Sequence, residues 1–331
     1  MKSLLLILPL LLLVFISGCM PMTHPPGLPN ITPYSNDYYY RTEDGATLPL
    51  KQWLPKTRTR AVLIALHGFN DYSNFFADPG IFFSGKGIAC FAYDQRGFGA
   101  APQRGLWAGI PAYTHDLRVF VKLIRQRYPH QPIYLLGESM GGAIIITAMN
   151  PINIPDIAGI ILAAPALWAR QTMPWYQTTL LWALAHTVPR LTLTGQSVGV
   201  KPSDNIEMLR ALGRDPLIIK KTRVEAIYGL TNLMDTAFNS ADRLNINTFM
   251  LYGEKDELIP KEPTYQFLRR FLSSGNQTKT VGFYPQGYHM LLRDLQAPIA
   301  WQDIATWITK HSTKLPSGAD LRAKEVLQSH L

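Results

Sequence analysis

The sequence predicts an α/β protein whose mostly parallel sheet is covered by helices on both faces. Short, continuously apolar runs, such as AVLIAL at 61–66, alternate along the chain with stretches of helical periodicity, such as 111–128. Strands that are buried on both faces have continuous apolar runs of this kind, because neither face meets water. Strands and helices that alternate in this way form a parallel sheet with right-handed crossovers.

Each element is predicted from its own local signal. Helix 111–128 begins at a proline, has apolar residues on one face and is followed by Pro129. Further helices are predicted from similar patterns at 141–149, 206–212, 224–233, 263–272 and 298–310. The predicted strands are 38–41, 48–53, 61–66, 88–93, 133–136, 157–163, 248–252 and 280–284.

Residues 167–240 interrupt this alternation because they contain no clear strand. We interpret them as a mostly helical cap inserted between two parts of the core, 37–166 and 241–331. Three of the seven tryptophans, Trp168, Trp175 and Trp182, lie within the cap. Some large side chains there must form a small core of their own. We also expect the three tryptophans to bind an apolar substrate as the lining of a lid.

Residues 1–18 have the features of a secretory signal peptide, since Lys2 precedes a 13-residue apolar run. Such a run is too short to be a typical membrane-spanning helix. It ends in ISGC at 16–19, which resembles a bacterial lipobox and implies cleavage after residue 18 and acylation of Cys19. The alternative is an ordinary secretory signal with an incidental cysteine.

The residues after the cleavage site predict where the protein is held. Met20 stands where an aspartate is the usual signal for retention in the inner membrane, so we expect a lipid-anchored protein of the bacterial cell envelope, in the outer membrane rather than the inner one. Residues 19–36 are rich in Pro, Asn and Thr, which predicts the acylated cysteine followed by an extended tether.

Composition excludes several classes of protein. With 47% hydrophobic and 17% charged residues, the chain cannot be disordered over most of its length. The net charge of +9 comes from scattered Lys and Arg residues rather than a stripe, so no nucleic-acid partner is expected. The charge serves solubility or attraction to an anionic membrane. Cys90 lies in an apolar run and is predicted to be a buried core residue.

The clearest chemical motif is GESMG at 137–141, which follows one predicted strand and opens one predicted helix. A G-x-S-x-G sequence in this context exposes its serine on a sharp turn at the carboxyl end of the sheet. The helix N-terminus places backbone N–H groups beside that serine. We therefore predict Ser139 to be a nucleophile.

A serine hydroxyl requires a base, and the base requires an orienting acid. His289 follows the last predicted strand and is the expected base, whereas surface positions are expected for the later or inserted histidines. Asp256 lies in the loop after the preceding strand and is the expected acid. Its neighbours Glu254 and Glu257 are interpreted as solvated charges.

The oxyanion formed during acyl transfer needs two backbone N–H donors. One is expected from Met140, directly after the nucleophile. The other is expected from Phe69, in the loop that follows strand 61–66.

Taken together, these segments resemble the monoacylglycerol lipase and lysophospholipase branch of the α/β-hydrolases. HGFNDYS, DQRGFG, GESMGGA, YGEKDELIP and GYHMLL follow one another in the order of that branch over about residues 60–295. The resemblance implies the α/β-hydrolase fold, an eight-stranded sheet, a cap between strands six and seven, and the triad Ser139, Asp256 and His289. It also implies that Asp94 and Arg96 order the loop beside the site, although Phe98 departs from the usual RGHGxS pattern.

We therefore expect a serine hydrolase that cleaves carboxylic esters, with lipid monoesters such as monoacylglycerols or lysophospholipids as substrates. Two alternatives stay open: a serine aminopeptidase, with Glu138, Asp204 or Glu207 binding the substrate amine, and a non-catalytic surface lipoprotein. The sequence contains no P-loop, dinucleotide fingerprint or metal-ligand cluster, so no cofactor or metal is expected.

Overall fold

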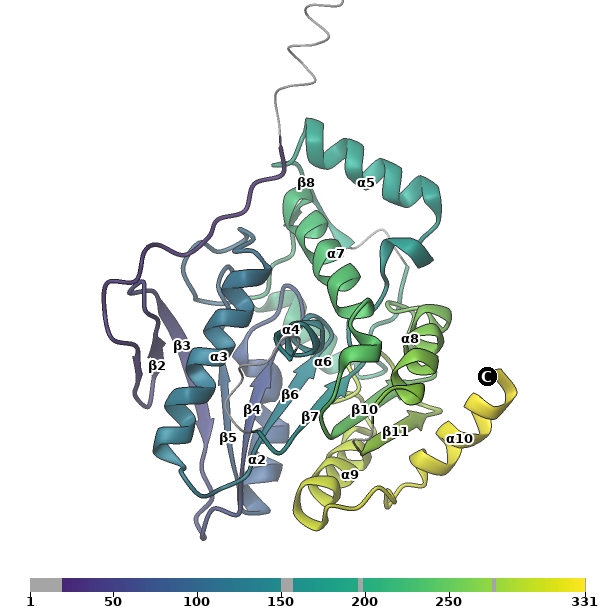
Figure 1. Ribbon diagram of the computed structural model, residues 1–331. Coiled ribbons are helices and arrows are strands. Elements are labelled where there is room, and N and C mark those ends of the chain that lie inside the picture. Colours follow the sequence, from purple (N-terminus) through teal and green to yellow (C-terminus); the bar gives the residue numbers. More distant parts are fainter. Residues whose placement is uncertain (1–19, 150–156, 196–198, 276–277, 331) are drawn as a thin grey trace, which may run out of the picture.

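A computed structural model describes residues 20–149, 157–195, 199–275 and 278–330 (Figure 1). The predicted signal peptide at 1–18 and the predicted acylation site Cys19 lie outside the described residues. Among the residues that are described, no helix combines the length and apolar composition needed to cross a bilayer.

The centre of the fold is a nine-stranded sheet in the order β1-β2-β3-β5-β4-β6-β7-β10-β11. The six strands from β5 to β11 in this order are parallel, and β1, β2 and β3 extend one edge in antiparallel pairing. The strands are β1 (Tyr34–Ser35), β2 (Tyr39–Arg41), β3 (Thr47–Trp53), β4 (Ala61–Leu66), β5 (Ile88–Tyr93), β6 (Ile133–Glu138), β7 (Gly159–Ala163), β10 (Thr248–Gly253) and β11 (Lys279–Tyr284).

All eight predicted runs form strands of this sheet, so the mostly parallel sheet is confirmed. The implied count of eight is wrong by one strand. The two-residue β1 pairs with β2 through Tyr34 and Arg41 at the outer edge. A strand of two residues has no alternating pattern, so only the neighbouring strand identifies it.

Helices cover both faces of the sheet, as predicted, and the side chains of β4 show how the faces divide. Val62 and Ile64 belong to one hydrophobic cluster, whereas Leu63 and Ala65 belong to the other, because successive residues of a strand point to opposite faces. The helices of the core are α2 (Ala77–Gly85), α3 (Ile110–Arg127), α4 (Met140–Ala148), α8 (Lys261–Ser273), α9 (Ala297–Lys310) and α10 (Ala319–His330), with 3-10 turns at Ser73–Phe76 and Ala241–Arg243.

The chain between β7 and β10 is mostly helical and lies above the carboxyl ends of the strands (Figure 1). It contains a 3-10 turn (Arg170–Thr172), α5 (Trp175–Thr187), α6 (Ile206–Arg214) and α7 (Val224–Phe238), together with β8 (Thr192–Leu193) and β9 (Thr222–Arg223). The last two form a small antiparallel pair that the sequence did not predict, since each strand has only two residues. Helix α7 packs on α4, which joins this segment to the core.

The segment expected to be an extended tether instead lies along the body of the protein. His24 N–H donates to the carbonyl of Trp107 over 2.7 Å, and Gly27 N–H donates to Asp44 Oδ2 over 3.1 Å. The amide of Asn30 donates to the Glu43 carbonyl over 2.8 Å. A proline-rich segment cannot form a full ladder of hydrogen bonds, but its remaining N–H groups find acceptors in the turn between β2 and β3 and at Trp107.

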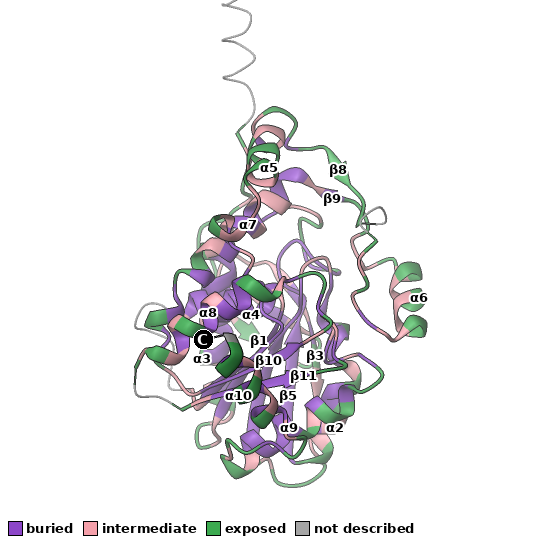
Figure 2. Cartoon of the chain, turned by 90° about the vertical axis from the view of Figure 1, so that its right-hand side faces the viewer, coloured by how far each residue is buried: buried purple, intermediate pink, exposed green. Residues whose placement is uncertain are grey.

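Helix α4 lies so close to β4 that its first turn has no space for a side chain at residue 141. A Cβ added to Gly141 would lie 2.2 Å from the carbonyl oxygen of Leu66. The G-x-S-x-G turn therefore needs glycine here for packing. Most of α4 is buried in consequence (Figure 2).

We predict that Gly141→Ala lowers the free energy of unfolding by about 1–3 kcal/mol or more, since the new methyl group collides with backbone. Gly213→Ala, in the exposed helix α6 with no atom within 4 Å of the new Cβ, is the matched control. It is expected to be neutral or stabilising by up to about 1 kcal/mol, because alanine favours helices. Urea unfolding measures both. Equal stability of the two variants would contradict the close approach of α4 to β4.

Candidate active site

Ser139 lies on a sharp turn between β6 and α4, with backbone angles of φ 53° and ψ −114°. A positive φ is strained for a residue with a side chain and persists only where the surroundings enforce it. Here the Ser139 N–H donates to the carbonyl of Ala163 over 3.0 Å. The Ser139 carbonyl accepts from Ala143 N–H over 3.1 Å and from Ala166 N–H over 2.9 Å. These bonds hold the turn, and the Ser139 side chain stays partly accessible.

Asp256 and His289 are brought together from loops that follow β10 and β11. His289 Nδ1 lies 2.8 Å from Asp256 Oδ2, and both side chains are buried. The other oxygen of Asp256 accepts from the N–H groups of Leu258 and Ile259 over 2.8 and 2.9 Å. The carboxylate is therefore fixed, and a proton on Nδ1 leaves Nε2 as the basic nitrogen.

The two neighbouring acids point elsewhere. Glu254 forms a two-pronged ion pair with Arg322, with N···O distances of 2.8 and 3.0 Å. Glu257 accepts from the backbone N–H of Lys201 over 2.7 Å. Asp256 is therefore the acid of this loop that meets the imidazole.

The surroundings of His289 favour its protonated form. Burial by itself would lower the pKa of His289, but the charge and the hydrogen bond of Asp256 outweigh burial and raise the pKa above its usual value. The Glu138 carboxylate also raises the pKa of His289, and the Arg293 guanidinium opposes it.

The two predicted oxyanion donors belong to segments that adjoin Ser139. Met140 is the first residue of α4, and the first amides of a helix have no acceptor within that helix. Phe69 lies in the loop after β4. That loop passes directly beside the serine, because a Cβ added to Gly68 would lie 3.4 Å from Ser139 Cβ.

His67 links this loop to the loop after β5. Its Nδ1 lies 2.8 Å from the carbonyl oxygen of Gly68, and its Nε2 accepts from the Gln95 N–H over 3.0 Å. Burial lowers the pKa of His67, which keeps the ring neutral and suited to donating and accepting at once. Phe98 packs edge-on against His67 at 5.5 Å and against Phe69 at 5.6 Å, at the position where the sequence departs from the usual RGHG pattern.

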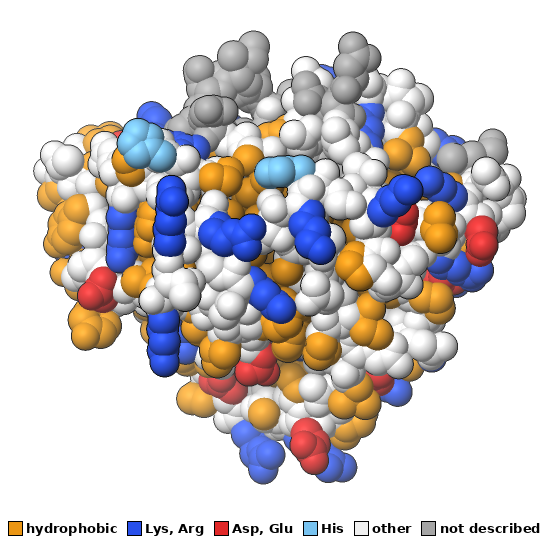
Figure 3. All heavy atoms as spheres, turned by 90° about the horizontal axis from the view of Figure 1, so that it is seen from below, with side chains coloured by type: hydrophobic (Ala, Val, Ile, Leu, Met, Phe, Trp, Pro, Cys, Tyr) orange, Lys and Arg blue, Asp and Glu red, His pale blue; other side chains and the backbone are white. Residues whose placement is uncertain are grey.

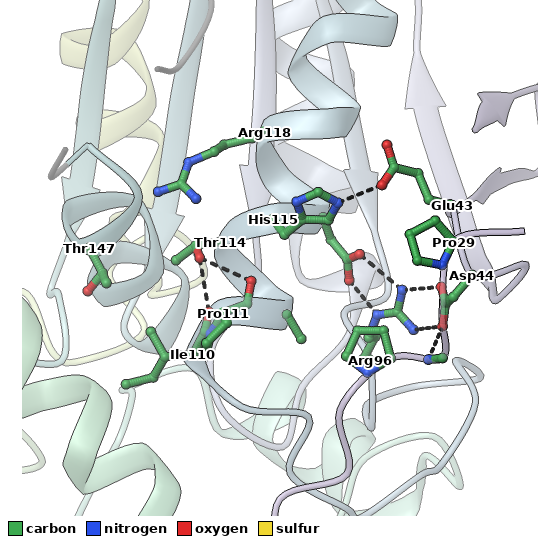
Figure 4. A pocket seen from close by; sticks show the side chains of 14 residues that line it. Pro29, Glu43, Asp44, Arg96, Ile110, Pro111, Thr114, His115, Arg118 and Thr147 are labelled. Carbon is green, nitrogen blue, oxygen red and sulfur yellow. Dashed lines mark hydrogen bonds and ion pairs between the residues drawn. The ribbon is translucent and has the colours of Figure 1, made fainter. Parts of the chain in front are cut away.

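Asp94 and Arg96 make the contacts that order the loop after β5. Asp94 accepts from the N–H groups of Ser73 and Ala100 over 3.0 and 2.9 Å. Arg96 lies between Asp44 and Asp116 and pairs with both at 2.6–3.1 Å (Figure 4). Asp44, Arg96 and Asp116 line a cavity of about 630 Å³, together with residues of the segment from Pro26 to Pro29.

The three predicted substrate-contacting tryptophans have different surroundings. Trp168 is half-buried and packs against the main hydrophobic cluster. Trp175 and Trp182 lie on α5 and are 78% and 57% exposed. Trp182 stacks on His186 at 4.5 Å. Two of the three rings are therefore exposed to solvent on α5, a helix that Figure 2 colours largely as exposed or intermediate.

Sequence reasoning missed two buried charged residues beside the site, Asp71 and Arg293. Arg293 contacts both Asp71 and Glu138 at 2.7 Å. Glu138, considered above as a partner for a substrate amine, is thus already paired and buried. No pattern within a single sequence marks three charges that meet only after folding. Within the described ranges, no three His, Cys, Asp or Glu side chains are grouped as metal ligands.

Residues 57–296 match the family described as Serine aminopeptidase, S33 (Hydrolase_4). The chain belongs to this family. The hydrolase is 26% identical over 277 residues to the monoglyceride lipase of Mus musculus, covering 82% of this chain and 89% of that one. It is 24% identical over 275 residues to the monoacylglycerol lipase of Mycolicibacterium smegmatis, covering 81% and 94%.

Solved structures show the same fold. A soluble variant of the monoglyceride lipase from Saccharomyces cerevisiae, in complex with a substrate analogue, superposes with a TM-score of 0.70 at 20% identity, covering 88% of this chain and 99% of that one. The monoacylglycerol lipase of Paleococcus ferrophilus superposes with a TM-score of 0.61 at 20% identity, covering 80% and 99%. The hydrolase therefore has the α/β-hydrolase fold.

We predict that Asp256→Asn moves the titration of His289 to lower pH, because the carboxylate that outweighs burial is gone. Glu254→Gln is the control, since Glu254 pairs with Arg322, and it is expected to leave the His289 titration unchanged. Histidine ring signals followed by NMR across pH report both. An unchanged His289 midpoint in Asp256→Asn would contradict the pairing.

Proposed function

We propose that this hydrolase cleaves carboxylic esters of the monoacylglycerol class through an acyl-enzyme on Ser139. The observation that carries the proposal is the Asp256–His289 hydrogen bond of 2.8 Å, in a fold that places a strained, accessible serine at the carboxyl ends of the same sheet. The similarity to monoglyceride lipases over four-fifths of the chain supports the choice of an ester.

In the proposed mechanism, His289 Nε2 takes the proton of Ser139 as Oγ attacks the ester carbonyl. The N–H groups of Met140 and Phe69 stabilise the oxyanion, and such a donor contributes about 3–4 kcal/mol to lowering the barrier. The protonated imidazole then gives its proton to the departing glycerol oxygen. A water molecule, activated in the same way, releases the fatty acid and restores the serine.

A serine aminopeptidase is the competing function, and the family's description includes that activity. Recognition of a free amine requires a carboxylate that is available to the substrate. Glu138 is buried and paired with Arg293, and Asp204 accepts from the backbone N–H of Leu295 over 2.9 Å. Glu207 lies exposed on α6. The contacts of Glu138 and Asp204 disfavour these two carboxylates as partners for a substrate amine, whereas Glu207 stays accessible.

We predict that Ser139→Ala abolishes monoacylglycerol hydrolysis, with a fall in kcat of about 10⁴-fold or more, because the acyl-enzyme cannot form. Covalent labelling by a fluorophosphonate is expected to be lost in the same variant. Ser329→Ala, at an exposed position of α10, is the control and is expected to retain both hydrolysis and labelling. Faster cleavage of peptide amides than of esters by the unmodified protein would contradict the ester assignment and favour the aminopeptidase.

We further propose that the mature protein is attached to the outer membrane of a bacterial envelope by acyl chains on Cys19, after removal of residues 1–18. The position of the first described residues supports this proposal. Met20 is 78% exposed, and His24 lies 3.9 Å from Glu225 of α7. An anchor on the preceding residue would therefore bring the α5 side of the protein towards the bilayer (Figure 1).

The outer face of α5 has the composition of a surface that enters the membrane interface. Its large apolar side chains are 56–78% exposed, and Ala185 is the buried residue of the helix. We call this surface the apolar cap face; it consists of Trp175, Tyr176, Leu180 and Trp182. Exposed large apolar side chains with aromatic rings among them are typical of surfaces that bind at a membrane interface. The opposite face of the molecule instead shows many Lys and Arg side chains (Figure 3).

We predict that the double variant Leu180→Ser, Trp182→Ser weakens binding of the non-acylated protein to phosphatidylcholine vesicles by about tenfold or more, because about 3 kcal/mol of apolar burial is lost. Ile81→Ser, Leu321→Ser is the matched control, since both side chains are exposed but lie on α2 and α10. Vesicle co-sedimentation measures both. The first variant could instead bind as well as the wild type, only to anionic lipid, and lose binding in salt. This result would assign the membrane contact to the Lys- and Arg-rich face shown in Figure 3.

A further inference from the structure

We propose that Arg293 is a positioning residue for the reaction. By bridging the carboxylates of Asp71 and Glu138, it holds three loops of the active site in one arrangement. The proposal rests on the proposed function, because it concerns the same serine and imidazole.

The contacts of Arg293 join segments that are distant in the sequence. Its Nη2 lies 2.7 Å from Asp71 Oδ2 and 2.7 Å from Glu138 Oε1. Glu138 directly precedes Ser139, and Asp71 follows Phe69 by two residues. Arg293 itself follows His289 by four residues. One guanidinium group therefore connects the nucleophile turn, the predicted oxyanion loop and the loop that carries the base.

Asp71 and Arg293 are each held in place by further contacts. The other oxygen of Asp71 accepts from Tyr72 N–H over 2.8 Å. The Arg293 N–H donates to the carbonyl of Met290 over 2.8 Å, and its guanidinium lies 5.8 Å from the centre of the Phe75 ring. All three charged side chains are at most 9% exposed. A displacement of any one of them would therefore be transmitted to its loop.

The cluster is poorly suited to a purely structural purpose. Arg293 Nε and Glu138 Oε2 are buried without a hydrogen-bond partner. Buried charges that are incompletely satisfied stabilise a fold no better than well-packed apolar side chains of similar volume. Apolar side chains cannot fix direction, whereas a planar guanidinium donates to carboxylate oxygens only along the directions of its N–H bonds.

The cluster also affects the pKa of His289, the proposed base. Asp256 raises the pKa of His289 most strongly, and Glu138 and Arg293 shift it in opposite directions. The charges of Asp71 and Glu138 raise the pKa of Arg293, so the guanidinium stays protonated despite its burial. Altering one member while keeping the others therefore changes the pH at which the imidazole becomes available as a base.

Arg293→Lys tests the bridge, because lysine retains the charge but its compact ammonium group does not reproduce the planar geometry in which Nη2 contacts both carboxylates. With the purified protein and a soluble p-nitrophenyl ester, we expect kcat to fall on the order of 10²-fold, as for small misplacements of reacting groups. We expect KM to change little. Arg322→Lys is the matched control, since Arg322 also pairs with a carboxylate but is 42% exposed and contacts Glu254. It is expected to keep the wild-type kcat.

Glu138→Gln tests the effect on the base with little change of shape. Removing this negative charge destabilises the imidazolium, so the acid limb of the kcat/KM profile is expected to move to lower pH. If Arg293→Lys fails to fold, Glu138→Gln by itself tests the positioning role. Folded variants with wild-type kcat and an unmoved acid limb, even with a lowered melting temperature, would overturn the proposal and leave a structural role only.

The unmodified protein separates this inference from the proposed function. Absence of both ester hydrolysis and fluorophosphonate labelling in the wild type would refute the function, and the positioning role would fall with it. An active wild type with fully active Arg293→Lys and Glu138→Gln would refute the positioning role alone.

Discussion

The positive φ of Ser139 is the constraint on which the rest of the structure depends. A serine does not adopt this conformation unaided, and three hydrogen bonds to its backbone enforce it from β7, α4 and the segment after β7. This turn also requires α4 to approach β4 so closely that residue 141 has no space for a Cβ. The strain is local, whereas the structure that maintains it comes from both halves of the sheet.

Charge inside the fold is organised around the same turn. Asp256 is fixed by two backbone N–H groups and by His289, so the imidazole has one orientation and one basic nitrogen. On the other side, Glu138 and Arg293 are buried within the reach of that imidazole. Burial disfavours every one of these charges, but each has an opposite charge or a hydrogen-bond donor beside it. The site therefore combines reactive groups with a nearly rigid electrostatic environment.

The segment above the site has a different character from the core. Its helix α7 packs against α4, whereas α5 is turned outward and exposes large apolar side chains. The first described residues lie against the same segment through His24 and Glu225. Apolar exposure and the first described residues thus lie on one side of the molecule, above the carboxyl ends of the strands. A substrate that resides in a membrane would approach from that side.

The sequence by itself determined the alternation of strands and helices over most of the core, without α2, α10 and the two-residue strands, and it identified Ser139, Asp256 and His289 as candidates. Continuous apolar runs and the glycine-flanked serine are local signals, because each involves only neighbouring residues and can be recognised in the sequence alone. Only the tertiary structure decided that Arg293 joins Asp71 and Glu138, that residues 24–31 lie along the body, and that α5 faces outward. These outcomes depend on which surfaces and charges meet across long separations in the chain. No periodicity or spacing records them, because the contacts exist only once the sheet has assembled.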